Sequence, residues 1–162
     1  MNPDENILRL ANINQASGRP RQVTLAQQKE WLPRACQNLN KILQATDAKI
    51  VISSTWRLSY SIHELDQILT NNGILAKVHG VTPSFNSDSL IVPGTRRGVE
   101  IAAYLKAHPE ITNYVILDDD SDMLIEQKPY FILVSTGVGL TDRQAQHAIQ
   151  KLNDEHNERK QI

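Results

Sequence analysis

The stretch Tyr114-Val115-Ile116-Leu117-Asp118-Asp119-Asp120-Ser121-Asp122 joins an uninterrupted apolar run to a cluster of acidic side chains. A short apolar run without alternation predicts a strand that is buried on both faces, which is typical of a parallel sheet. Four carboxylates within five residues repel one another, and a hard divalent cation such as Mg²⁺ would offset that repulsion. The alternative is a solvated cluster that begins a short helix, where acidic residues suit the helix dipole. Because the cluster directly follows a buried strand, we favour a metal site.

A second run, Lys49–Ser53, is rich in β-branched residues and also predicts a buried strand, which continues into Ser54-Thr55-Trp56-Arg57. Hydroxyls and a guanidinium at a strand end can hold an oxyanion such as phosphate. A Ser- and Thr-rich turn that only leads into a helix would have the same composition. Taken alone, these residues leave both interpretations open.

Further strands are predicted over residues 74–79 and 130–134. Apolar spacing and capping boxes predict helices over residues 24–46, 61–72, 96–108 and 141–155, with a break or kink near Pro33. Short buried strands that alternate with amphipathic helices predict an α/β fold with a mainly parallel sheet. In such sheets the active crevice lies outside the carboxyl ends of the strands, so we expect the serines and the acidic cluster at one edge.

The chain is long enough for one domain, which we place at residues 24–156. Residues 1–23 are predicted to be irregular, apart from Ile7–Leu10, which could form a strand or a helical turn. Residues 157–162 are predicted to be a frayed tail.

A net charge of −1 over 162 residues argues against a strongly basic nucleic-acid clamp. The single cysteine, Cys36, excludes an intramolecular disulfide, and its apolar helical neighbours favour a buried core thiol. The N-terminal stretch does not resemble a signal peptide, and no apolar run approaches the roughly 20 residues that span a bilayer. We therefore expect a cytoplasmic location.

Arg96 and Arg97 open the helix predicted at residues 96–108. Cations at the start of a helix oppose its dipole, so this position has an energetic cost. A salt bridge to a phosphate or to the acidic cluster would explain the pair functionally. A solvated pair on the surface is the other interpretation.

Together, in chain order, these motifs resemble the haloacid dehalogenase-like (HAD) domain of Swiss Army Knife RNA repair proteins, over about residues 31–152. The motifs are Ser53-Ser54-Thr55-Trp56-Arg57, Thr82-Pro83, Arg97-Gly98-Val99-Glu100-Ile101, Leu117-Asp118-Asp119-Asp120 and Gly139-Leu140-Thr141. The resemblance implies a Rossmann-like, three-layer α/β/α fold. It also implies Mg²⁺-dependent hydrolysis of phosphate monoesters, with a phosphorylated substrate such as a nucleic-acid end.

In that superfamily a first aspartate attacks phosphorus, and the aspartate two positions later acts as general acid and base. Other residues hold the phosphoryl group, neutralise its charge and bind the metal, as phosphoryl transfer requires. The resemblance assigns catalysis to Ser54, Ser53 and Arg97, phosphate binding to Ser54, Thr55 and Arg97, and Mg²⁺ ligation to Asp118, Asp119 and Asp122.

The family's Asp-x-Asp-Gly-Val motif follows an apolar first strand, and no Asp-x-Asp occurs here ahead of Thr24. Met1-Asn2-Pro3 resembles the loop that would follow that strand. We therefore expect the chain to begin just downstream of it, with the central strand absent or replaced and the domain inactive.

Two alternatives come from other classes. One is a non-catalytic regulatory or binding domain that keeps the acidic metal site. The other is a receiver-like signalling domain, which is disfavoured because no lysine follows residues 130–134 before the last predicted helix.

Overall fold

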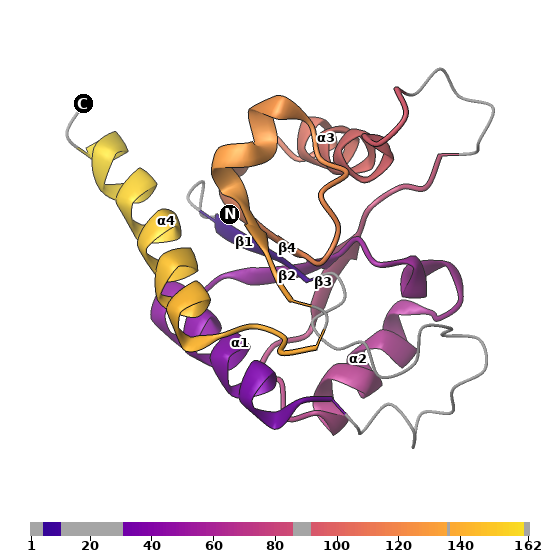
Figure 1. The fold of residues 1–162 in the computed structure, drawn as a ribbon, viewed down its shortest axis with the longest axis vertical. Helices are drawn as coiled ribbons and strands as arrows, with labels where there is room; N and C mark the ends of the chain where they lie inside the picture. Colours follow the sequence, from indigo (N-terminus) through magenta and orange to yellow (C-terminus); the bar gives the residue numbers. More distant parts are fainter. Residues whose placement is uncertain (1–4, 11–30, 86–91, 136, 161–162) are drawn as a thin grey trace.

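The computed structural model describes residues 5–10, 31–85, 92–135 and 137–160 (Figure 1). Five strands form one sheet in the order β3-β2-β1-β4-β5. Every pairing is parallel, which confirms the predicted α/β class with a mainly parallel sheet. The strands are β1 (Glu5–Leu10), β2 (Lys49–Ile52), β3 (Val78–Val81), β4 (Ile111–Asp118) and β5 (Phe131–Leu133).

The central strand is present, and it corrects the expectation that the first strand is absent or replaced. β1 pairs with β2 on one side and with β4 on the other. Its sequence, Glu-Asn-Ile-Leu-Arg-Leu, lacks the continuous apolar run that is typical of a central parallel strand. The segment 1–23, predicted to be irregular, therefore contains the middle of the sheet, and the strand alternative for Ile7–Leu10 is confirmed. The rest of that segment lies outside the described residues.

Four α-helices and two 3₁₀ turns connect the strands within the described part of the chain. They are α1 (Pro33–Thr46), η3 (Thr55–Leu58), α2 (Ile62–Asn71), α3 (Arg96–Ala107), η4 (Ile125–Tyr130) and α4 (Asp142–Lys160). The capping box predicted at Ser61 is present: its side chain accepts from the Glu64 backbone N–H and the Glu64 carboxylate accepts from the Ser61 N–H. The same reciprocal pair joins Thr141 and Gln144.

The predicted helix 24–46 is confirmed only from Pro33 onward. Pro33 occupies the first helical turn of α1, where its missing N–H has no intrahelical partner to lose. Residues 24–30, with the capping box expected at Thr24, lie outside the described residues. At the other end of the chain α4 continues to Lys160, so the tail predicted to fray from residue 157 is helical that far.

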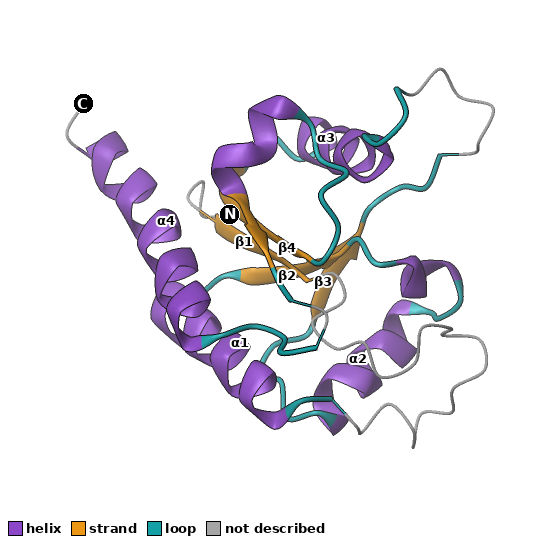
Figure 2. Cartoon of the chain, in the orientation of Figure 1, coloured by secondary structure: helices purple, strands orange, loops and turns teal. Residues whose placement is uncertain are grey.

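Helices cover both faces of the sheet (Figure 2). On one face α1, α2 and α4 share a large apolar cluster with Ile50 and Ile52 of β2. On the other face, Tyr104 of α3 packs against Val51, the strand residue between those two isoleucines. Neighbouring strand side chains point to opposite faces, so both faces of β2 are buried, as its β-branched run predicts.

Cys36 lies in the larger cluster with 4% of its surface exposed. Burial raises the pKa of its thiol to about 11, so the thiol stays protonated and unreactive near neutral pH. This confirms the predicted core thiol. None of the helices in the described ranges combines the length and apolarity needed to cross a bilayer.

Candidate functional site

The register of the sheet brings several strand ends side by side. Leu10, which ends β1, pairs with Ile52 of β2 and with Leu117 of β4. The residues that come next on these neighbours, Ser53 and Asp118, therefore flank the carboxyl end of β1. Because adjacent strands lie about 4.8 Å apart and β1 stands between β2 and β4, the backbones at Ser53 and Asp118 are two spacings, roughly 10 Å, apart. This is the edge at which the sequence predicts the site.

Ser53 and Ser54 are both buried at this edge, whereas Thr55 is exposed at the start of η3. The Ser54 hydroxyl accepts a hydrogen bond of 3.3 Å from the Trp56 N–H, which caps η3. The Ser53 hydroxyl is fully buried and has no partner among the described residues. A buried hydroxyl without a partner is costly, so Ser53 is the stronger candidate for contact with a ligand.

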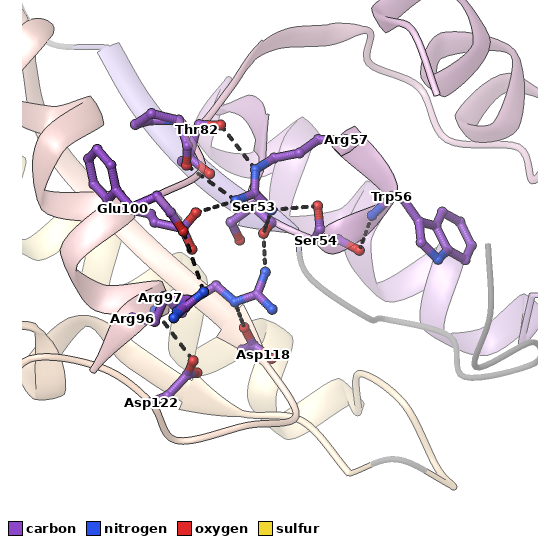
Figure 3. Close-up of polar contacts among 12 residues, drawn as sticks. Ser53, Ser54, Trp56, Arg57, Thr82, Arg96, Arg97, Glu100, Asp118 and Asp122 are labelled. Carbon is purple, nitrogen blue, oxygen red and sulfur yellow. Dashed lines mark hydrogen bonds and ion pairs between the residues drawn. The ribbon is translucent and has the colours of Figure 1, made fainter. Parts of the chain in front are cut away.

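Arg97 joins the two halves of the predicted site (Figure 3). It lies in the first turn of α3, and its Nη1 donates to the backbone carbonyl of Ser53. Its Nε lies 3.5 Å from Oδ2 of Asp118. The guanidinium thus spans from the end of β2 to the end of β4, across the carboxyl end of β1. Of the two predicted explanations for the arginine pair, the structure places Arg97 in the site, while Arg96 reaches out to the carbonyl of Phe85 at 3.4 Å.

Asp118 is an unusually placed carboxylate, because its side chain is fully buried at the end of β4. Oδ1 accepts from the Asp120 N–H at 3.0 Å. Burial raises the pKa of Asp118 to about 7, although Arg97 and the Asp120 N–H oppose the rise. Near neutral pH this group therefore sits close to its midpoint, and Arg97 is the cation that stabilises its ionised form.

Of the other predicted metal ligands, Asp119 interacts with the Asp118 carboxylate and helps to raise its pKa, whereas Asp122 lies at the start of α3. Asp122 caps α3: its Oδ2 accepts from the Arg97 N–H at 3.3 Å and its carbonyl from the Gly98 N–H at 3.0 Å. Asp119 is half-buried beside Asp118 along the chain. Among the residues that the structure describes, no three His, Cys, Asp or Glu side chains are grouped so that they could hold a metal ion. Asp118 Oδ2 and Asp122 Oδ1 are nevertheless buried without a hydrogen-bond partner among the described residues, and these two aspartates, with Asp119, are the residues that would hold the Mg²⁺ that the resemblance implies.

Arg57, whose guanidinium the sequence left open between an oxyanion contact and a turn, is part of the scaffold. Its guanidinium donates to the carbonyls of Ser53, Ser54, Thr82 and Pro83 and to the Glu100 carboxylate, at 2.5 Å for the last. Its side chain is 3% exposed and that of Glu100 is 6% exposed. Since these acceptors match its five N–H donors, Arg57 has none left for a ligand. It ties η3, the end of β3 and α3 together.

Thr82 is a residue of this edge that the sequence placed in a loop. The strand predicted over residues 74–79 is displaced to Val78–Val81, so Thr82 directly follows β3 and donates its N–H to Ile52. Its hydroxyl is buried and, within the described ranges, has no partner. The sequence contains the Thr82-Pro83 motif, but only the end of β3 at Val81 places Thr82 at this edge of the sheet.

The position after β1 can now be read from the sequence. Since the strand ends at Leu10, the residues that follow are Ala11-Asn12-Ile13-Asn14. The family pattern has Asp-x-Asp after its first strand, and here two asparagines have the same spacing. In the sequence, amides therefore stand at the spacing at which the family has carboxylates. Asn12 and Asn14 themselves lie outside the described residues.

The parallel sheet carries a hydroxyl pair, an arginine and a buried aspartate at its carboxyl edge. The family model described as the HAD domain in Swiss Army Knife RNA repair proteins matches residues 12–145, and the chain belongs to this family. Comparisons with curated proteins and with solved structures gave no significant match. Membership of the family supports a phosphatase-type function in general terms.

Proposed function

We propose that this domain recognises a phosphate monoester and does not hydrolyse it. The observation that carries the proposal is the central strand β1, which is followed in the sequence by Asn12 and Asn14 where the family has its two aspartates. A neutral amide oxygen is a far weaker nucleophile than a carboxylate and cannot serve as general acid and base at neutral pH. The rest of the edge keeps groups that suit a phosphate.

Three side chains support phosphate recognition. Ser53 offers a buried hydroxyl, Ser54 lies beside it at the start of η3, and Arg97 offers a guanidinium. The Arg97 side chain is 14% exposed, so its guanidinium is accessible to an incoming anion. Hydroxyl and guanidinium donors are the groups that bind phosphate oxygens most strongly in proteins. Thr55 is the outer candidate.

The finer features of the family extend the proposal. With α3 on one face of the sheet and α1, α2 and α4 on the other, we take the architecture to be the three-layer α/β/α arrangement of HAD domains. We propose the terminal phosphate of a nucleic acid as the ligand, a proposal supported by the family's description as RNA repair proteins. A lone cysteine, Cys36, which permits no intramolecular disulfide, supports the cytoplasm as the compartment.

Turnover of p-nitrophenyl phosphate in buffer with Mg²⁺ tests whether the domain hydrolyses phosphate monoesters. We expect none from the wild-type chain, and we expect the double variant Asn12→Asp/Asn14→Asp to gain measurable turnover because it restores both carboxylates. A matched control is Asn12→Ser/Asn14→Ser, which changes the same positions without adding charge. Wild-type turnover that Asp119→Asn abolishes would show that the domain is a working phosphatase and would refute the proposal.

Binding is tested separately with a 5′-phosphorylated oligoribonucleotide, the same oligonucleotide without its phosphate, and inorganic phosphate. We expect the phosphorylated strand to bind and the unphosphorylated strand to bind at least tenfold more weakly. Equal binding of the two strands would exclude the terminal phosphate as the recognised group.

A further inference from the structure

A second buried residue with a hydroxyl, Thr82, lies beside Ser53. Ile52 of β2 pairs with Val81 of β3, and the Thr82 N–H donates to the Ile52 carbonyl at 3.0 Å. Ser53 and Thr82, which follow this pair, therefore stand next to each other at the ends of adjacent strands, about 4.8 Å apart. Thr82 is 3% exposed and Ser53 is fully buried, and neither hydroxyl has a hydrogen-bond partner in the described part of the chain.

Both side chains belong to the face of the sheet that α3 covers. Ile52 and Val81 pack into the apolar cluster of α1, α2 and α4 on the opposite face. Because side chains alternate along a strand, the next residue on each strand points toward α3. Figure 3 shows Ser53 between Thr82 and Asp118, as the strand order requires. Thr82 therefore extends the site on the side away from Asp118.

The backbone at both residues is held by guanidiniums. Arg57 donates to the carbonyl of Ser53 at 2.7 Å and to that of Thr82 at 3.0 Å. Arg97 also donates to the Ser53 carbonyl. The carbonyls are thus occupied, while the hydroxyls are not. A buried hydroxyl without a partner costs free energy, and two of them on a fixed backbone indicate a place for a ligand.

The charges beside the two hydroxyls differ. Ser53 lies beside the accessible guanidinium of Arg97, which suits a phosphate. Thr82 lies beside Arg57, which is 3% exposed, is paired to the Glu100 carboxylate at 2.5 Å and has no N–H donor left. Such a neutralised pair does not attract an anion, whereas a neutral oxygen can hydrogen-bond a hydroxyl without help from a cation.

We infer that Thr82 is a further ligand-binding residue of this site, and that its hydroxyl hydrogen-bonds a neutral oxygen of the sugar that carries the phosphate. The inference rests on the proposed function and extends it from the phosphate to the group esterified to it. Ser53 and Arg97 hold the phosphate, and Thr82, one strand farther from Asp118, holds the sugar beside it. Thr82 thus distinguishes a phosphorylated sugar from inorganic phosphate.

Isothermal titration with inorganic phosphate and with the 5′-phosphorylated oligoribonucleotide, in buffer with MgCl₂, tests this role. Thr82→Val keeps the branched shape of the side chain and removes the hydroxyl. We expect it to weaken oligonucleotide binding by roughly 5- to 20-fold, as for the loss of one buried hydrogen bond, and to leave the affinity for inorganic phosphate within about twofold. Thr82→Ser keeps the hydroxyl and should bind the oligonucleotide within about threefold of wild type.

Two further variants serve as controls. Ser53→Ala should weaken the binding of both probes, because it removes a contact with the phosphate that they share. Thr46→Val removes another buried hydroxyl, which donates to the Ile42 carbonyl at 2.6 Å near the start of β2, at the opposite edge of the sheet. It should change neither affinity.

The outcomes separate the inference from the proposed function. A Thr82→Val variant that binds both probes like wild type, or that loses affinity for both equally, would overturn the inference and leave the proposed function standing. Failure of the wild-type chain to bind either probe would refute the proposed function and the inference with it.

Urea unfolding without ligand distinguishes a ligand-binding hydroxyl from a structural one. Since the Thr82 hydroxyl has no hydrogen bond to lose among the described residues, Thr82→Val should unfold at the same urea concentration as wild type or at a higher one. A lower unfolding midpoint would show that the hydroxyl serves the fold and would overturn the inference.

Discussion

Replacing the buried carboxylate with an amide, Asp118→Asn, should stabilise the protein above neutral pH. Burial raises the pKa of Asp118 from 3.8 to about 7 in the folded protein. Between these two values the folded state holds a proton that the unfolded state has released, so this group lowers stability as the pH rises. A difference of about 3 pH units, at about 1.4 kcal/mol each, amounts to a cost of about 4 kcal/mol once the pH exceeds 7. Asparagine has nearly the same shape and carries no such cost.

The assay is urea unfolding of both proteins in EDTA at pH 5 and pH 8. At pH 5 part of the cost is already present, so the free energy of unfolding of Asp118→Asn should rise relative to wild type by about 3 kcal/mol between the two pH values. Asp142→Asn is the control: Arg34 and Lys41 lower the pKa of this exposed carboxyl, so it is ionised at both pH values. Its difference from wild type should stay constant. A constant difference for Asp118→Asn as well would refute the reasoning that burial dominates this carboxyl.

The remaining predictions concern the scaffold that positions the site. Glu100→Gln leaves the buried Arg57 guanidinium without its counter-charge, so the free energy of unfolding, measured in urea, should fall by about 3–5 kcal/mol. Arg34→Ala removes an exposed ion pair and should lower the free energy of unfolding by at most about 1 kcal/mol. Gly98→Ala should cost about 1–3 kcal/mol, because a Cβ there would lie 2.5 Å from the backbone nitrogen of Leu124. A Cβ on Gly137 meets nothing within 4 Å, so Gly137→Ala should change the unfolding midpoint little.

Much of the fold could be predicted from local signals. The capping box at Ser61, Pro33 at the start of α1, and the apolar runs of β2 and β4 each act within a few residues of themselves. For β1 the local signal left a strand and a helical turn open over Ile7–Leu10, because Asn6 and Arg9 interrupt the apolar pattern, and its pairing with β2 and β4 decides for the strand. Because β1 ends at Leu10, the family's Asp-x-Asp position falls on Asn12 and Asn14 in the sequence, and not on a segment ahead of Met1.

The part of the site that follows from the fold class could also be predicted from the sequence. Ser53, Arg97 and Asp118 come together because parallel strands and the helix that follows them meet at one edge, which is a property of the fold class. The role of Arg57 depends on acceptors up to 43 residues away in the sequence. Asp122 caps α3 at Arg97, which lies 25 residues before it. Long-range partners of this kind leave no local pattern, so the role of Arg57 stayed open and the helix-capping contact of Asp122 was not predicted.

The most direct test of recognition without hydrolysis is ³¹P NMR of the wild-type chain mixed with a 5′-phosphorylated oligoribonucleotide, before and after addition of MgCl₂. We predict that the phosphomonoester resonance shifts or broadens on adding protein, and that no inorganic phosphate signal appears over a day with or without Mg²⁺. A growing inorganic phosphate signal would contradict the account, and so would a phosphomonoester resonance that the protein leaves unchanged.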